Sequence, residues 1–307
     1  MKRIITFVFL IAIIPCLIFA SLEVHFVDVG QGDSIIINAD GHYGIIDGGP
    51  SNKSQFLYSY IKKLGATPFE LIVISHTDGD HVGGIVSAVE AVGIANKCTI
   101  WCNDLESNQR QFTAFKSRVA SAGCKIVDPV VGTTIMLGNA RITVIGPISK
   151  SGRRNDDSIV VKLEYAGKTF LFMGDAERLE ENSLINEYSP VLTEFGKYPL
   201  SELKADVLKV GHHGADNSAT QYFLNYVKPD ISVISVGENN RNGHPTENTL
   251  SRLVQSGSKI YRTDVNGTVK IRVNDRGSII VESQKSSKPW VDENLLSSQQ
   301  RENAYSN

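Results

Sequence analysis

The pattern of apolar and polar positions divides the chain into two successive runs of strands and helices. Short apolar runs punctuated by glycine predict strands at 22–30, 33–39 and 43–49. Residues 54–65 place apolar side chains at helical spacing and end on a glycine, which predicts a helix. The continuous apolar segment 69–75 is typical of a strand buried on both faces. The first run is therefore a strand meander followed by alternating helix and strand.

The alternation continues and is then repeated in the second half of the chain. The next expected elements are a helix from Val82 to about Val92, a strand at 98–102, a helix at 111–123 and a strand at 124–129. The second half opens with two strands within 158–175, and the expected elements after residue 204 are a strand within 205–214, a helix at 218–227, a strand at 230–237, a helix at 246–257 and closing strands to about 283. Two facing sheets with helices outside satisfy this order, which predicts an α/β fold of the four-layer αββα sandwich type. A plain α/β sheet fits the composition almost as well.

The first twenty residues have a pattern of their own. Lys2 and Arg3 precede an unbroken apolar run that ends in the small residues Ala20 and Ser21. This pattern predicts a signal peptide at 1–20 and export of the protein to an extracellular or periplasmic location. An anchor formed by an uncleaved N-terminal segment is the alternative.

The rest of the chain is expected to be one domain with a tail. No later segment has the ~20 apolar residues of a membrane span. We therefore expect a single domain at 21–283, and a disordered tail at 284–307, because that stretch is polar and aperiodic.

Composition and charge narrow the class of partner. The 307 residues are 41% hydrophobic and 21% charged, as in ordinary globular proteins. Of the 31 lysines and arginines two lie in residues 1–20, which leaves 29 basic against 33 acidic residues in the expected mature chain. A protein that binds nucleic acid tightly usually has a basic surplus, so tight nucleic-acid binding is not expected.

Three cysteines remain outside the expected signal peptide: Cys98, Cys102 and Cys124. An odd number allows at most one disulfide in an oxidising compartment. A bridge between Cys102 and Cys124 and a set of buried thiols both fit the sequence.

The candidate chemistry begins with "SHTDGDHVGG" at 75–84, which follows the buried strand directly. Ligand sites of α/β sheets collect at the carboxyl ends of strands. In an extended stretch His76 and Asp78 point the same way, while Asp80 and His81, at the start of the next turn, can aim at a second point. The glycine pair lets the backbone pass close behind. One segment could therefore contribute ligands to two metal ions.

Two other interpretations of this segment compete with a metal site. A calcium loop of the EF-hand type beginning at Asp78 would need oxygen ligands where Val82 and Val89 stand, so that interpretation fails. A solvated polar turn is the simpler alternative, and the position at the end of a buried strand counts against it.

The segment resembles the H-x-[HD]-x-D-H signature of the metallo-β-lactamase superfamily. Six further stretches resemble motifs of that superfamily in the same order: "VDVGQGDS", "IIDGG", "NDDSIVVKL", "FMGD", "KVGHHG" and "NGHP". The set is most similar to the soluble hydrolase domain of ComEC-type DNA-uptake proteins and covers roughly residues 22–283. The resemblance implies the αββα fold predicted above.

The resemblance also implies a dinuclear metal site. Its expected ligands are His76, Asp78, Asp80, His81, Asp175 and His213, with His212 as the alternative to His213. His76 and Asp78 would hold the first ion. Asp80 and His81 would hold the second, together with His213 or His212. Asp175 would bridge the two ions. Residues 155–157 stand where many relatives have another histidine. The first site is therefore richer in oxygen, and either zinc or manganese is expected.

Other polar residues have expected roles. Asp80, His212 and His244 are the expected catalytic residues, with His244 as readily a structural residue before its proline. Asp47 in "IIDGG" either orients a ligand histidine or serves as a strand-end turn residue. Four aspartates converging on one pocket would repel without cations, which favours bound metal. His25 and His42 are expected to be structural.

The implied function is exported, metal-dependent hydrolysis. The resemblance implies a phosphodiesterase or nuclease in which two ions activate a water molecule, with a phosphodiester of nucleic acid or of the cell envelope as substrate. Hydrolysis of another ester, a thioester or a β-lactam on the same fold is one alternative. A non-catalytic exported domain that binds metal or nucleic acid is the other. The sequence does not indicate the oligomeric state.

Overall fold

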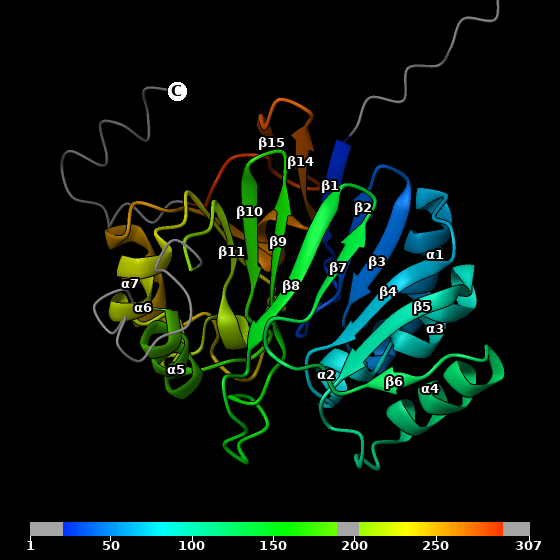
Figure 1. Cartoon of the computed structure of the whole chain (residues 1–307). Helices are drawn as coiled ribbons and strands as arrows, with labels where there is room; N and C mark the ends of the chain where they lie inside the picture. Colours follow the sequence, from blue (N-terminus) through cyan, green and yellow to red (C-terminus); the bar gives the residue numbers. More distant parts are fainter. Residues whose placement is uncertain (1–20, 189–202, 291–307) are drawn as a thin grey trace, which may run out of the picture.

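Two facing β-sheets form the centre of the fold in the computed structural model, which describes residues 21–188 and 203–290 (Figure 1). The strands of the first sheet, in spatial order, are β15 (Ile279–Ser283), β14 (Val269–Asn274), β1 (Ser21–Phe26), β2 (Ile35–Ala39), β3 (His42–Ile46), β4 (Phe69–Ile74), β5 (Ile94–Cys102) and β6 (Ile126–Val127). The strands of the second are β13 (Lys259–Arg262), β12 (Ile231–Ile234), β11 (Val207–Lys209), β10 (Lys168–Phe172), β9 (Val160–Tyr165), β8 (Ala140–Gly146) and β7 (Thr134–Leu137).

Each sheet is parallel in one half and antiparallel in the other. Strands β3 to β6 are parallel in the first sheet, and β10 to β13 are parallel in the second. The remaining neighbours pair antiparallel, as in the β9–β10 hairpin around the turn at Ala166 and Gly167. Because ligand sites form at the carboxyl ends of parallel strands, this topology places one such edge in each sheet.

Helices cover the outer face of each sheet (Figure 1). The first sheet is covered by α1 (Ser54–Leu64), α3 (Ile85–Val92) and α4 (Arg110–Ser121), and the second by α5 (Arg178–Tyr188), α6 (Gln221–Val227) and α7 (Glu247–Gln255). Four short helical turns complete the described elements: η1 (Ser51–Lys53), α2 (Gly79–Val82), η4 (Gly211–Gly214) and α8 (Thr263–Asn266). The predicted four-layer αββα sandwich is confirmed.

Alternation along the strands explains the layers. On β1, Leu22, Val24 and Phe26 point into the core between the sheets, where Phe170 and Phe172 of the second sheet meet them. On β2, the side chain of Ile36 points to the other face of the sheet and packs under α1 with Leu57 and Ile61. Burial of both faces produces the continuous apolar runs seen in the sequence.

The structure differs from the predicted elements in three places. The helix expected from Val82 to Val92 begins at Ile85 as α3, and Val82 instead ends the short α2, because the glycine pair between them packs against backbone of another loop. The hairpin of β7 and β8 was not predicted, although its two-residue Gly138-Asn139 turn is a hairpin signal. Residues 284–290, which were expected to belong to a disordered tail, make backbone contacts with the domain: Gln284 N donates to Thr268 O, and Trp290 N donates to Ile260 O.

Two expectations lie partly or wholly outside the described residues. The predicted signal peptide at 1–20 is outside them, as are residues 291–307 of the expected tail.

Within the described ranges, no helix combines the length and the apolar character needed to cross a bilayer. Cys98, Cys102 and Cys124 are free thiols, so the Cys102–Cys124 disulfide is not formed.

A buried glutamate on α5 generates a prediction about stability. Glu180 is 2% exposed, and its Oε1 accepts a hydrogen bond from Ile148 N at 2.9 Å. Burial raises its pKa from 4.5 to about 8, against the lowering effect of that hydrogen bond. The folded chain therefore keeps a proton that the unfolded chain releases above pH 4.5. The contribution of this group to stability is present below pH 4.5 and is lost as the pH rises toward about 8.

Replacing this carboxyl with an amide should flatten the pH dependence of folding. Between pH 5 and 8 we expect the free energy of unfolding of Glu180→Gln to fall less than that of the wild type, by on the order of 2–4 kcal/mol. Urea unfolding at the two pH values measures this. The exposed Glu106→Gln is the matched control and should follow the wild type. Equal slopes for Glu180→Gln and wild type would contradict the assignment.

Candidate metal centre

The candidate site lies where the carboxyl ends of parallel strands from both sheets meet. Asp47 follows β3 and His76 follows β4 in the first sheet. Asp175 follows β10 and His213 follows β11 in the second. Segments far apart in the sequence are thus brought to one place, as expected for ligand sites of α/β sheets.

The motif that follows β4 is shaped by a close backbone approach. Asp78 is extended and immediately precedes α2, and Asp80 and His81 lie within that short helix. A Cβ atom on Gly84 would lie 2.2 Å from Gly48 O, so no larger residue fits there without a shift of the backbone. The expected close passage behind the histidines is therefore present.

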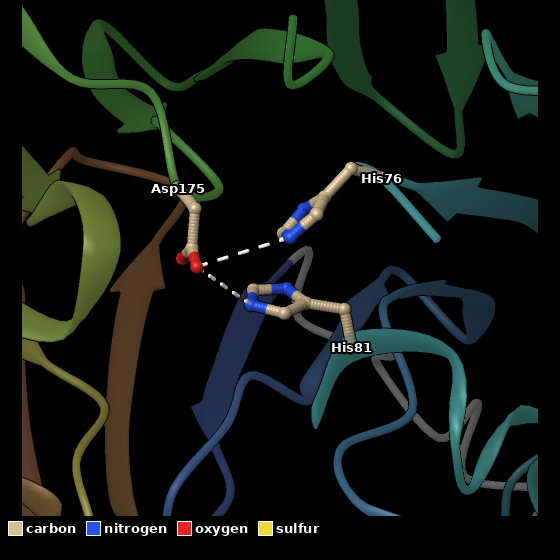
Figure 2. Close-up of side chains that lie close together, drawn as sticks. All are labelled: His76, His81 and Asp175. Atoms are coloured by element: carbon tan, nitrogen blue, oxygen red, sulfur yellow. Dashed lines mark ion pairs between the residues drawn. The ribbon is translucent and has the colours of Figure 1, made fainter. Parts of the chain in front are cut away.

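Histidines from both sheets converge on one carboxylate oxygen. Asp175 Oδ2 lies 3.2 Å from His81 Nε2, 3.5 Å from His213 Nε2, 3.8 Å from His76 Nε2 and 3.9 Å from His212 Nε2. Figure 2 shows His76 and His81 approaching this carboxylate from the same side. Asp175 is 3% exposed, and the His76, His81 and His213 side chains are almost fully buried.

The two remaining aspartates of the motif flank this cluster. Asp80 Oδ2 lies 3.4 Å from His213 Nε2. Asp78 Oδ2 lies 3.7 Å from His76 Nε2, while its other oxygen accepts a hydrogen bond from Arg154. The structure therefore brings all six expected metal ligands together.

Three compact groups of possible donors overlap at His81, and the group of His81 with Asp33 and Asp47 includes its orienting partner Asp47. Of the other two groups, one is formed by His76, His81 and Asp175, and one by Asp80, His81 and His213. His81 belongs to both, so the structure does not assign it to one side only. The predicted division between His76 with Asp78 and Asp80 with His81 is otherwise compatible with the geometry.

The unpaired atoms of the cluster fit a metal ion. The Nε2 atoms of His76, His81 and His213 are buried and have no hydrogen-bond partner among the described residues. An unpaired buried polar group is costly, so such atoms call for a ligand. Two donors that each lie ~2.1 Å from one ion are about 3.0–3.4 Å apart. The observed separations of 3.2–3.8 Å from Asp175 Oδ2 are close to that spacing.

The other ring nitrogen of two histidines is held by the protein. His81 Nδ1 lies 2.8 Å from Asp47 Oδ2, and Asp47 itself accepts hydrogen bonds from Ser75 N and Ser75 Oγ. His213 Nδ1 is 2.9 Å from the carbonyl oxygen of Ser235. These contacts fix each ring with Nε2 toward the cluster, which is how proteins orient histidine ligands. Asp47 thus has the position expected of an orienting partner.

A buried ion pair that the sequence did not predict supports the second sheet's side of the centre. Lys209 Nζ lies 2.6 Å from Asp33 Oδ2, and both side chains are at most 1% exposed. Burial tends to raise the pKa of Asp33, but Lys209 and His213 outweigh it and hold that pKa at about 2. Breaking such a pair on one side costs ~3–5 kcal/mol. Asp33 belongs to the "VDVGQGDS" stretch that resembles a superfamily motif, but no role is predicted for it from the sequence.

The charge of the cluster is met partly by the chain's own cations. Arg154 pairs with Asp78, and Lys209 pairs with Asp33. Burial acts to raise the pKa of Asp175, but His213 and His81 lower it well below its usual range. The repulsion expected among converging aspartates is therefore reduced before any metal binds.

The two adjacent histidines share a strained backbone but differ in burial. His212 and His213 have φ of 44° and 52°, in the left-handed region that non-glycine residues seldom adopt. His213 is buried in the cluster, whereas the His212 side chain is 23% exposed and its Nδ1 lies 2.8 Å from Glu177 Oε1. Of the two alternatives, His213 is therefore the one within the compact donor groups.

His244 lies beside His212 on the more open side. Their ring centroids are 5.2 Å apart, and the Nδ1 atom of His244 is buried without a partner among the described residues. Burial, together with His212 and His213, lowers the pKa of His244 to about 4. A neutral imidazole there can donate one hydrogen bond and accept another.

The loop at 155–157 has a single residue at the cluster. Asn155 Nδ2 donates to Glu177 Oε1 at 3.1 Å and lies 3.4 Å from His212 Nδ1. Asp156 instead accepts hydrogen bonds from backbone N–H groups at the start of α5, and Asp157 closes a turn at Gly152. Asn155 thus stands beside the position where many relatives were expected to have a histidine.

Two histidines lie outside the cluster. His25 is buried and its Nδ1 is 2.8 Å from the Tyr60 hydroxyl. His42 pairs with Glu70 at the surface. Both have the structural environment that was expected.

A comparison with protein families identifies the superfamily. A family model described as the beta-lactamase superfamily domain matches residues 44–215, more than half of the chain. The chain belongs to this superfamily. The match begins within β3 and includes the motif at 75–84, Asp175 and both histidines of η4.

Curated superfamily relatives are longer than this chain. ComE operon protein 3 of Bacillus subtilis is 27% identical over 290 residues, which cover 88% of this chain and 35% of the relative. Competence protein ComA of Neisseria gonorrhoeae is 27% identical over 81% of this chain and 32% of its own length. Recombination protein 2 of Haemophilus influenzae is 25% identical over 87% of this chain and 31% of its own length. The chain thus spans about a third of the length of these relatives.

Solved structures agree with the fold. The metallo-beta-lactamase fold protein YhfI from Bacillus subtilis matches with a TM-score of 0.51 and 10% identity, over 86% of this chain and all of that one. The diiron beta-hydroxylase CmlA from Streptomyces venezuelae matches with a TM-score of 0.50 and 13% identity, over 82% of this chain and 54% of that one. At these identities the likeness concerns the fold alone.

The position of Asp175 generates a prediction about metal binding. Asp175 Oδ2 faces histidines of more than one donor group, so we expect Asp175→Ala to weaken the binding of both manganese ions. Each affinity should fall by more than the ~10–100-fold expected for loss of an orienting partner. His76→Ala and Asp80→Ala each remove a donor from one group and should each weaken mainly one ion. Calorimetric titration of metal-free protein with manganese measures these affinities.

The surface variant His42→Ala is the control and should bind manganese like the wild type. An Asp175→Ala protein that retains both affinities would show that the carboxylate does not belong to the site. Thermal unfolding of each metal-free variant separates lost ligands from lost folding.

Proposed function

We propose that this chain is a metal-dependent hydrolase that cleaves phosphodiester bonds with two divalent cations, zinc or manganese, bound at the candidate centre. The observation that carries the proposal is the set of three buried histidine Nε2 atoms that face one carboxylate oxygen and have no hydrogen bond within the described part of the chain. A structural role alone would not need three such atoms at one point, because each unpaired polar atom destabilises the fold.

The ligand roles combine two of the donor groups with Asp78, which lies beside His76. His76 and Asp78 would hold one ion, Asp80, His81 and His213 the other, and Asp175 both. When bound, such a pair of cations lowers the pKa of a water molecule and neutralises charge on the reacting group.

The chain's own residues would hold the substrate from the open side. His212 and His244 lie together there, and one of them would donate a hydrogen bond to a phosphoryl oxygen. Glu177 fixes the His212 ring through Nδ1, which leaves Nε2 on the side of Asp175. Asp80, whose side chain is 34% exposed, would position the attacking water from the other side.

The relatives support a phosphodiester as the substrate class. One of the curated relatives is named a competence protein and another a recombination protein. The names support the phosphodiester of a nucleic acid, although the chain spans only about a third of these proteins. Phosphodiesters of the cell envelope share the same reacting group.

A substrate panel tests this function. The full chain loaded with manganese or zinc should hydrolyse bis(4-nitrophenyl) phosphate and leave a chromogenic β-lactam nearly intact. Removal of metal with a chelator should abolish turnover, and added manganese should restore it, because the proposed reaction needs a metal-activated water molecule. Asp175→Ala should lose about 100-fold or more in kcat/KM, on the order of the loss of a main electrostatic contributor.

The variant His42→Ala serves as the control and should keep wild-type turnover. Faster hydrolysis of the β-lactam than of the phosphodiester would contradict the proposed substrate class and indicate another class of hydrolase. Full activity in chelator would rule out the metal mechanism, and absence of turnover with manganese bound would favour a non-catalytic binding domain.

We also propose that the protein acts outside the cytoplasm. The support is the sequence of residues 1–20, with two basic residues, an apolar run and small residues at the expected cut. Sequencing the N-terminus of the protein recovered from the medium or periplasm should give a chain that begins near Ser21. An intact Met1 in the membrane fraction would instead indicate an anchor, and an intact Met1 in the cytoplasm would overturn export.

A further inference from the structure

A polar pocket opens beside the candidate centre. It has a volume of about 290 Å³, and His76 forms part of its wall. The rest of the wall comes from Asn103 and Asp104, which follow β5, and from the loop between β8 and β9 that carries Lys150 and Arg154. The volume equals that of about ten water molecules in the liquid, which is enough for a phosphate group and its attached sugar or alcohol.

The acidic side chains of this pocket are already engaged by internal donors. Asp157 accepts hydrogen bonds from the backbone N–H groups of Ser151 and Gly152 and from the Ser151 hydroxyl. Asp104 accepts a hydrogen bond from the Thr77 hydroxyl. Their carboxylates therefore have roles in holding the loops that shape the pocket.

The basic side chains, in contrast, keep unused donors. A guanidinium has five N–H groups, and the only hydrogen bond of Arg154 to the described residues is donated to Asp78. The nearest other acid, Asp104, is 3.9 Å from its Nε, which is too long for a hydrogen bond. Lys150 uses two of its three donors, on Asn103 O at 2.9 Å and on Asp128 Oδ2 at 2.6 Å. Both side chains are 51% exposed.

Arg154 also connects the pocket with the centre. It contacts Asp78 Oδ1, while Asp78 Oδ2 faces His76 Nε2. An anion held by Arg154 would therefore lie next to the group that reacts, on the same side as His76. Guanidinium and ammonium groups are the usual partners of phosphate oxygens in proteins.

We propose that Arg154 and Lys150 form an anion subsite for a second phosphate of the substrate, adjacent to the phosphodiester that is cleaved. This inference rests on the proposed function and deepens it. It makes the substrate class one that carries neighbouring phosphates, such as an oligonucleotide or a polyol-phosphate chain, and not an isolated diester.

The experiment compares substrates that differ by one phosphate. The dinucleoside phosphate TpT has only the diester, and the same compound with a terminal 5′ or 3′ phosphate adds the second group. With manganese-loaded full-length protein, we expect kcat/KM to rise at least tenfold when one of these phosphates is added. Glycerol-phosphate oligomers assayed alongside distinguish a cell-envelope polymer from a nucleotide as the source of the phosphates.

The matched variants are Lys150→Met and, as the control, Lys125→Met, which removes an exposed lysine elsewhere. Lys150→Met should erase at least tenfold of the gain from the added phosphate, chiefly through KM. The control should keep that gain. Arg154→Met should have a larger effect, and its manganese affinity must be measured as well, because Arg154 also holds Asp78. A residue that only positions Asp78 would change manganese affinity and all substrates equally.

A binding measurement separates failure of this subsite from failure of the proposed function. Calorimetry with metal-free protein and the phosphorylated dinucleotide, in chelator, should show binding by wild type and at least tenfold weaker binding by Lys150→Met. Hydrolysis of TpT without any gain from a second phosphate would overturn the subsite alone. Equal losses on every substrate in Lys150→Met would do the same. No hydrolysis of any diester would overturn the proposed function, and the calorimetric comparison would then decide on the subsite.

Discussion

The convergence of histidines on the carboxylate of Asp175 requires a fixed position of the two sheets relative to each other. Asp175 comes from the second sheet, whereas His76 and His81 come from the first, and the relevant atoms are 3.2–3.8 Å apart. A displacement of one sheet by a single ångström would change every one of these separations. The packed core between the sheets, to which Phe26 and Phe172 contribute, prevents such sliding because close-packed interiors tolerate little volume change. The buried pair of Lys209 with Asp33 adds a charged connection between the same two sheets.

The layers of the fold were predictable because burial on two faces leaves a strong mark on a strand. The continuous apolar run at 69–75 and the repeated order of strands and helices were enough for the αββα arrangement. Where tertiary contacts decide, prediction was less accurate. The break between α2 and α3 depends on backbone from another loop, and the continuation to Trp290 depends on pairing with β13.

The candidate site was predictable to the extent that its members are neighbours in the sequence. His76, Asp78, Asp80 and His81 form one segment, and their common position at a strand end follows from local pattern. The partners of these residues were not predictable. Arg154 meets Asp78 across 76 positions of sequence, and nothing in the local pattern of either loop indicates that contact. Burial separates two histidines that the sequence presents as equivalent, because His213 lies inside the cluster while His212 is 23% exposed.

The origin of the donors in both sheets has a thermodynamic consequence. Neither sheet alone presents the assembled set, so a cation that needs donors from both binds only the fully packed chain. Mass action then makes the free cation a contributor to folding: at a concentration a thousand times its dissociation constant, such a ligand adds about 4 kcal/mol to the unfolding free energy. That amount is a large share of the 5–15 kcal/mol typical of a domain. The durability of the sandwich would thus vary with the ionic composition of its surroundings, independently of any reaction.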